Sequence, residues 1–201
     1  MIKRNLLVMG LAVLLSACGF QLRGTGATEL TIKELDLTAR NAYGETVVLL
    51  RRALENSGVK VYAGAPYKLV LTNEQDSQRI LSYTGGGGTG EYEAVTVLSY
   101  DIRGAHNLPL MSDKIEVRKI YVHDGNNLLG SDQEASDARN ESRRELVQRM
   151  ILRLQQITPA QLDQLQQTAE AKAKAEAQAL EASKKAEANT PRQSPVQIPQ
   201  Q

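Results

Sequence analysis

The feature that most constrains the fold is the regular alternation of side chains along residues 92–103. Apolar or small side chains occupy every second position there, from Tyr92 to Ile102, so an extended chain would place them all on one face. A strand with one apolar face is stable only when that face is buried against another layer of structure. The sequence therefore predicts a β-sheet with one covered face.

Shorter extended segments are predicted on both sides of this strand. Most of them are rich in β-branched or aromatic residues and are bounded by Gly, Pro, Asn or Asp. In the first segment, residues 30–37, the alternation of apolar and polar residues shifts by one position at Glu34, and we expect a β-bulge there. These segments are residues 30–37, 59–62, 67–72, 79–84 and 114–123.

Two stretches change to the 3.6-residue period of an amphipathic helix. Residues 42–57 place apolar side chains on one face, with Asn41 as N-cap and Gly58 just after the last turn. A capping-box pattern from Ser131 to Glu134 begins a second, longer helix, which we expect to end near residue 157. Its buried stripe is predicted to be Leu146, Val147, Met150, Ile151, Leu154 and Ile157.

The order of elements is therefore β-α-β-β-β-α. Strands clustered between two helices favour an α+β fold, with both helices packed on one face of a mostly antiparallel sheet of about four strands. We place this domain at residues 29–159. Residues 160–201 are a low-complexity Ala/Glu/Lys/Gln and Pro/Gln tail, expected to be helical without an apolar stripe or disordered.

Composition and charge exclude several functions. The 24 Lys and Arg residues are balanced by 23 Asp and Glu, so the basic excess typical of nucleic-acid binding is absent. One cysteine and two histidines cannot supply a four-ligand zinc site by themselves. The glycines of residues 85–90 fit a dinucleotide motif in spacing, but a strand pattern follows them where a helix is required. We predict no catalytic residues, no metal and no dissociable cofactor.

The N-terminus has the pattern of a lipoprotein signal. Lys3 and Arg4 precede an apolar stretch over residues 6–15, and the sequence Leu15-Ser16-Ala17-Cys18 resembles the lipobox of bacterial lipoproteins. The resemblance implies that residues 1–17 are removed. It also implies that Cys18 receives a diacylglycerol and an N-acyl chain such as palmitate, with residues 18–28 forming the acylated cysteine and a spacer. Gly19, in place of Asp after the cysteine, favours the outer membrane.

Two arginines stand out in the predicted second helix. Arg139 and Arg143 fall on the same stripe as Leu146 and Met150, where a buried, unpaired guanidinium would cost several kcal/mol. That half of the helix should therefore not cover the core. Either these arginines lie in water beyond the sheet, or they form an anion-binding rim together with Lys114, Arg118 and Lys119 of the preceding strand.

The whole pattern resembles a known family. Its most specific part is the segment Cys18-Gly19-Phe20-Gln21-Leu22-Arg23-Gly24, which precedes the strand, helix, strands and final helix. Gly90-Glu91-Tyr92 at the start of the long strand and Arg118 in the next strand also match. Up to about Pro159 the chain resembles the LptE family, the lipopolysaccharide-assembly lipoproteins of Gram-negative bacteria.

The resemblance implies a function without catalysis. LptE proteins plug the lumen of the β-barrel LptD in a 1:1 complex, assist its assembly, and bind lipopolysaccharide (LPS) on its way to the outer leaflet. The chain would be lipid-anchored in the outer membrane, with its domain in the periplasm and the barrel lumen. Family segments expected to carry basic LPS contacts correspond here to residues 85–90 and 129–131, which have none. The candidate LPS or anion contacts are therefore Arg79, Lys114, Arg118, Lys119, Arg139 and Arg143.

Two other functions remain open at the level of sequence. One is a lipid-anchored periplasmic scaffold of a different envelope complex. The other is an envelope glycan hydrolase, which would need two carboxylates about 5 to 9.5 Å apart across a cleft.

Overall fold

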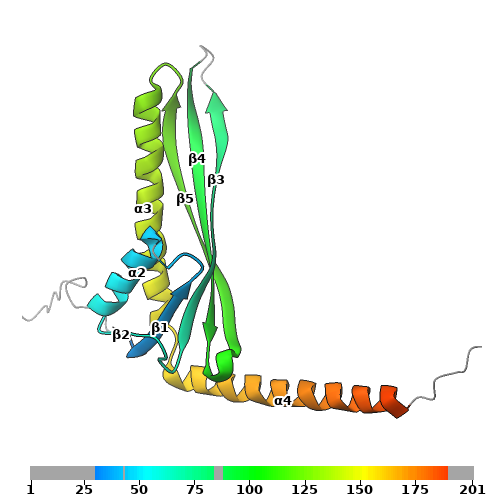
Figure 1. The fold of residues 1–201 in the computed structure, drawn as a ribbon. Coiled ribbons are helices and arrows are strands. Elements are labelled where there is room, and N and C mark those ends of the chain that lie inside the picture. The colour runs from blue at the N-terminus through cyan, green and yellow to red at the C-terminus, as the bar shows by residue number, and fades with distance from the viewer. Residues whose placement is uncertain (1–29, 43, 84–87, 190–201) are drawn as a thin grey trace, which may run out of the picture.

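The computed structural model describes residues 30–42, 44–83 and 88–189. Figure 1 shows a long sheet with two helices on one of its faces and a third helix leaving from one end. The predicted α+β class is confirmed. The predicted signal peptide, the lipidated cysteine with its spacer, and residues 190–201 lie outside the described residues.

The sheet has five strands in the order β2-β1-β3-β4-β5. The predicted sheet of about four mostly antiparallel strands therefore becomes a mixed sheet, because β1 runs parallel to both β2 and β3. The other two pairings are antiparallel. The strands are β1 (Glu34–Ala39), β2 (Lys60–Val61), β3 (Lys68–Tyr83), β4 (Thr89–Arg103) and β5 (Pro109–Asp124).

The third strand corrects a sequence prediction. Residues 67–72 and 79–84 were expected as separate strands, but β3 runs without a break between them. Only its first four residues, 68–71, pair with β1, so the remainder is an edge strand. Its side chains from residue 73 onward are exposed on both faces. Since neither face is buried there, no alternation of apolar and polar residues marks the strand in the sequence.

The helices are α2 (Glu45–Asn56), α3 (Leu128–Gln155) and α4 (Pro159–Asn189). Gly58 follows α2 in the left-handed conformation, φ +79°, as predicted, but the N-cap of α2 is Gly44 and not Asn41. The predicted capping box of α3 is also wrong. Asn127 caps the helix by accepting from the backbone N–H of Gly130, one turn earlier than expected. Ser131 instead binds the backbone of the preceding turn.

The core lies between the helices and the lower half of the sheet (Figure 1). The predicted stripe of α3 contributes Leu146, Met150 and Leu154, which are almost completely buried. Nearer the β3–β4 hairpin, α3 packs through small residues instead. There Ala138 lies against Ala94 and Tyr121 in a separate, smaller cluster. Fully buried side chains of the main core include Leu30, Leu35, Leu50, Leu54, Leu69, Leu98 and Ile102.

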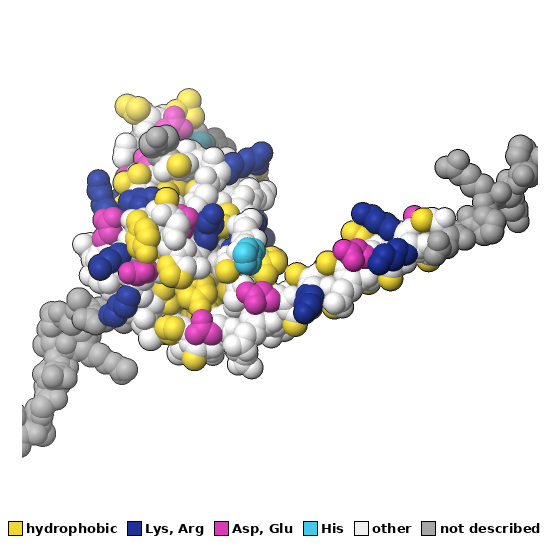
Figure 2. All heavy atoms as spheres, turned by 60° about the horizontal axis from the view of Figure 1, so that its bottom comes forward, with side chains coloured by type: hydrophobic (Ala, Val, Ile, Leu, Met, Phe, Trp, Pro, Cys, Tyr) yellow, Lys and Arg dark blue, Asp and Glu magenta, His cyan; other side chains and the backbone are white. Residues whose placement is uncertain are grey.

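The start of α4 is built into the domain. Thr158 and Gln161 cap it reciprocally, and Leu162 is fully buried in the main core although it lies in the stretch predicted as a tail. The Tyr67 hydroxyl donates a hydrogen bond to Asp163. Beyond these turns the helix projects away from the domain, with mostly exposed side chains (Figure 2). None of the helices in the described ranges is long and apolar enough to cross a membrane.

Candidate functional site

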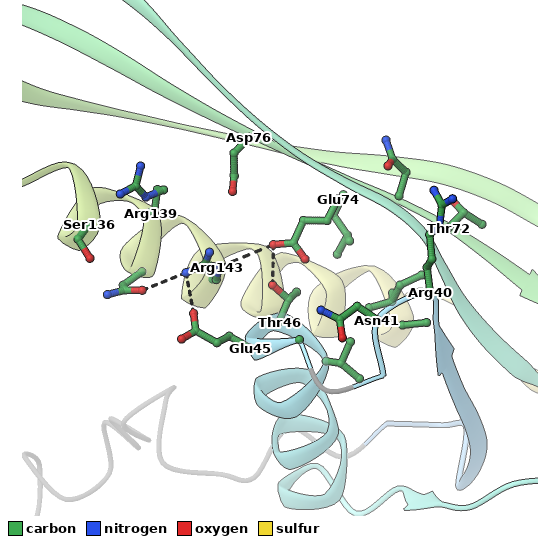
Figure 3. Close-up of a pocket in the computed structure, with 17 residues that line it drawn as sticks. Arg40, Asn41, Glu45, Thr46, Thr72, Glu74, Asp76, Ser136, Arg139 and Arg143 are labelled. Carbon is green, nitrogen blue, oxygen red and sulfur yellow. Dashed lines mark hydrogen bonds and ion pairs between the residues drawn. The ribbon is translucent and has the colours of Figure 1, made fainter. Parts of the chain in front are cut away.

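A cavity of about 860 Å³ opens beside the free edge of the sheet. It forms because β1 stops pairing at Ala39, opposite Leu71, and the chain turns away into α2. Beyond that point β3 has no neighbour on this side, and α3 borders the cavity with Ser136, Arg139 and Arg143 (Figure 3). Its charged lining residues are Arg40, Glu45, Glu74, Asp76, Arg139 and Arg143.

Arg143 joins the three elements around the cavity. Its Nη1 lies 2.7 Å from Oε2 of Glu45 on α2. Its Nε lies 3.7 Å from Oε1 of Glu74 on β3 (Figure 3). The buried Thr46 hydroxyl donates to the same Glu74 oxygen at 2.8 Å. One guanidinium on α3 thus fixes the start of α2 against the free edge of β3.

Two other arginines border the cavity without such partners. Neither Arg40 nor Arg139 forms an ion pair with any residue that the structure describes. The first turn of α2 also lines the cavity, so the positive end of this helix borders it. The N-cap, Gly44, has no side chain that could bind the amides of that turn. These donors can hold an anionic group. The carboxylates of the lining keep the overall charge of the cavity near neutral.

Two of the predicted cations lie on the open face of the sheet, away from the helices. Arg79 Nε contacts Glu93 at 2.6 Å, and Arg118 contacts Glu116 at 2.5 Å and Glu93 at 3.9 Å. The hydrogen bond from Arg79 lowers the pKa of Glu93, despite the opposing effect of burial. These arginines therefore already have carboxylate partners.

The two predicted lysines are separated as well. Lys119 lies on the helix face, where Glu145 at 2.9 Å and Glu141 at 3.1 Å hold it and raise its pKa. Lys114 pairs across the sheet with Ser99 on the open face and has no ion pair within the described part of the chain. Of the six predicted cations, only Arg139 and Arg143 line the same cavity.

Sequence reasoning missed the acidic half of this site. Glu74 and Asp76 lie in the polar stretch that joins the two predicted strands, and no local pattern connects them with a helix some seventy residues later. Asp76 accepts a hydrogen bond from Thr96 at 2.7 Å, so it faces the sheet as well as the cavity. Arg40 follows β1 directly and carried no periodic signal. Across the described ranges, no three His, Cys, Asp or Glu residues are grouped as metal ligands.

Comparison with known proteins agrees with this architecture. Residues 32–154 match the family model LptE, described as lipopolysaccharide-assembly. The LPS-assembly lipoprotein LptE of Pectobacterium atrosepticum is 29% identical over 162 residues, covering 77% of this chain and 86% of the relative. The LPS-assembly lipoprotein LptE of Yersinia enterocolitica is 26% identical over 169 residues, covering 81% of this chain and 80% of the relative.

Solved structures share the fold. The crystal structure of the rare lipoprotein B from Shewanella oneidensis aligns with a TM-score of 0.55 at 23% identity, over 61% of this chain and 93% of that one. The solution structure of a lipoprotein B from Nitrosomonas europaea also aligns with a TM-score of 0.55, at 24% identity. The alignment covers 70% of this chain and 90% of that one. Because the family model covers more than half of the 201 residues, the chain belongs to the LptE family, the non-enzymatic lipopolysaccharide-assembly lipoproteins.

Proposed function

We propose that this protein is the outer-membrane lipoprotein that pairs 1:1 with the β-barrel LptD. In this role it plugs and helps to assemble the barrel, and it assists the insertion of LPS into the outer leaflet. The observation that carries the proposal is the family match over residues 32–154, extended by relatives named LPS-assembly lipoprotein LptE over most of their length.

The anchor in this proposal is a lipid on Cys18. Three fatty chains would hold the protein on the membrane essentially permanently, because each buried CH₂ contributes about 0.8 kcal/mol. Leu30 follows Cys18 by twelve positions in the sequence, and a fully extended chain over twelve positions reaches about 40 Å. Leu30 bonds to Ser57 just after α2, so the tether attaches to the α4 end of the domain.

The LPS contact in this proposal begins at the cavity. LPS carries anionic phosphates, which guanidinium groups bind with charge-assisted hydrogen bonds. Arg139 is the foremost candidate because it borders the cavity without a carboxylate partner among the described residues. Arg143 would have to exchange its bond to Glu45 for one to phosphate. For Arg79, Arg118 and Lys119, carboxylates compete in the same way. Lys114 has no ion pair with a described residue, but it does not line the cavity.

The partnership is tested by purifying the tagged, full-length protein from outer membranes. We expect a large β-barrel protein to be recovered in an amount equal to that of the tagged protein. If no barrel is recovered, the partnership is refuted and the alternative function, a scaffold of another envelope complex, is favoured. A Cys18→Ser variant should not reach the outer membrane. If it is acylated and recovers the barrel equally well, the anchor assignment is wrong.

The LPS contact needs a separate measurement. Arg139→Ala should weaken LPS binding of the full-length protein about fivefold at low salt, roughly 1 kcal/mol, as expected for an exposed charge. Arg52→Ala is the matched control, because Arg52 is also an exposed helical arginine without an ion pair to a described residue. Equal loss in both variants would mean that only overall charge matters.

No observation favours the hydrolase. Glu45 and Glu74, two of the three carboxylates that line the cavity, are both ion-paired with Arg143.

A further inference from the structure

A second hollow, which we call the base groove, lies at the α4 end of the domain. It has a volume of about 520 Å³ and is lined by the end of α3, the first turns of α4 and the adjacent parts of β4 and β5. It shares no lining residue with the cavity described above. Figure 2 shows apolar side chains at the surface where α4 leaves the domain. The apolar residues that line the groove are Tyr100, Met111, Ile157 and Leu165.

Tyr100 gives the base groove a hydrogen-bond donor without an acceptor. This residue is 1% exposed, and its hydroxyl makes no hydrogen bond within the described part of the chain. Burial, and then the charge of Asp113, raise the pKa of Tyr100, so the hydroxyl keeps its proton. A buried donor without an acceptor lowers stability. A ligand of the groove should therefore bring an acceptor to this hydroxyl.

The polar lining fits a peptide better than a bare hydrocarbon chain. Three glutamines line the groove, and their side-chain amides can both donate to and accept from backbone peptide groups. The charged lining residues, Asp113 and Arg153, lie 3.8 Å apart and are both partly exposed. That distance is longer than a hydrogen bond, so either group can also pair with an incoming charge. The three glutamines are Gln156, Gln161 and Gln164.

The chain itself contains a peptide of this kind. The described structure begins at Leu30, which is bonded to the turn after α2 at the α4 end of the domain. In residues 18–29 only Phe20 and Leu22 have large apolar side chains. One residue separates them, so an extended backbone would place both on the same face, and Arg23 follows directly.

The N-terminal segment is long enough to reach the groove. Leu22 lies eight positions before Leu30, and Phe20 lies ten positions before it. Extended chains of these lengths span about 27 and 34 Å. Gly24 and Gly26, between Leu22 and Leu30, allow the chain to turn without steric cost.

The C-terminal tail is a poorer occupant. Thr168 lines the groove, and α4 carries the chain about 32 Å further, to Asn189. The tail would have to run back fully extended merely to bring its last apolar residue, Ile198, level with Thr168.

We propose that residues 19–23 dock in the base groove of their own chain. The two large apolar side chains of this segment would cover the apolar lining. A backbone carbonyl would accept the hydrogen bond from Tyr100, and Arg23 would pair with Asp113. Because Cys18 directly precedes the segment, docking would hold its lipid at the groove and the α4 end of the domain against the membrane. Only this consequence rests on the proposed lipid at Cys18; the docking does not depend on it, on the barrel or on LPS.

Engineered cysteines test the docking in the full-length protein in the oxidising periplasm, where cysteines in contact form disulfides. Leu22→Cys/Leu165→Cys joins the segment to the groove, and Leu22→Cys/Thr168→Cys repeats the test at a second groove position. Leu22→Cys/Leu152→Cys is the matched control. Leu152 is 56% exposed and does not line the groove, so an undocked segment would meet it as readily as Leu165, which is 37% exposed. Leu165→Cys alone should form no disulfide, because the lipid occupies the sulfur of Cys18.

Both groove pairs should form an intramolecular disulfide in at least fivefold greater yield than the control pair, measured by mass spectrometry of the linked peptides. Adding Phe20→Ser to Leu22→Cys/Leu165→Cys should lower the yield to that of the control pair. Adding Gln21→Ser, whose side chain would lie on the opposite face of an extended segment, should leave the yield within twofold.

Three results would overturn the inference. Equal yields for the groove and control pairs would mean that the segment does not dock. An unchanged yield after Phe20→Ser would mean that apolar contact does not hold it. A disulfide between two copies of the chain would assign the groove to the segment of a neighbouring molecule. By contrast, a disulfide in Leu165→Cys alone would place Cys18 at the groove and refute its acylation, so the docking and the anchor fail separately.

Discussion

Replacing Leu162 by alanine should destabilise the whole domain, although this residue belongs to a helix that mostly projects into solvent. Leu162 is fully buried in the main core, next to the turn that joins α3 and α4. If α4 were only an appended tail, truncating one of its side chains would change nothing in the sheet. The substitution therefore tests whether the first turns of α4 are part of the folded unit.

The magnitude follows from the burial. Leucine to alanine removes three carbon atoms, and at about 0.8 kcal/mol for each buried methylene the lost transfer energy is about 2.4 kcal/mol. The cavity left behind adds to this, and measured Leu→Ala changes in cores range from about 2 to 5 kcal/mol. We expect a loss of about 3 kcal/mol in the free energy of unfolding.

The assay is urea denaturation followed by near-ultraviolet circular dichroism of the seven tyrosines. This signal reports the packing of the domain, so melting of the exposed part of α4 does not obscure it. Leu180→Ala is the control, since Leu180 is exposed on the same helix and should change stability by less than about 0.5 kcal/mol. Equal unfolding free energies for the two variants would refute the reasoning.

Three further predictions concern other links in the structure. Arg143→Ala should cost about 1 kcal/mol of unfolding free energy, because Glu45 is largely exposed; a change no larger than that of Arg52→Ala would contradict the role of Arg143 as a link. Burial and the bond to Asp163 raise the pKa of Tyr67 to about 12, so their contribution to stability is complete below pH 10 and is lost between pH 10 and 12. The free energy of unfolding, measured from pH 10 to 12, should depend less on pH in the Tyr67→Phe variant than in the unmodified protein. The same pH dependence in both proteins would show that the bond to Asp163 is absent. For Cys18→Ser, mass spectrometry should find an uncleaved precursor without acyl chains; acyl chains on it would disprove the assignment.

Local periodicity predicted the buried parts of the fold. The alternation over residues 92–103 and the stripe of Leu146, Met150 and Leu154 are both consequences of burial on one face, and both elements were identified correctly. Where neither face of a strand is buried, the sequence shows no periodic placement of apolar residues. The middle of β3 is an exposed edge strand, so its residues looked like a connecting loop.

The candidate site was predictable only in part. That Arg139 and Arg143 do not cover the core followed from the cost of burying an unpaired guanidinium, and both line the cavity in the structure. In their half of α3, the small residues Ala138 and Ser142 are buried instead. The partner carboxylate Glu45 is 98 residues from Arg143. Contacts at that separation arise from the tertiary fold and leave no local pattern.

The central claim is that this chain is a non-catalytic subunit of LPS insertion. The most direct measurement is the amount of LPS reaching the outer leaflet in cells depleted of the protein, together with the amount of assembled barrel. The account predicts that both fall, and that both return when the unmodified chain is restored. Normal surface LPS and a normally assembled barrel in the depleted cells would contradict it.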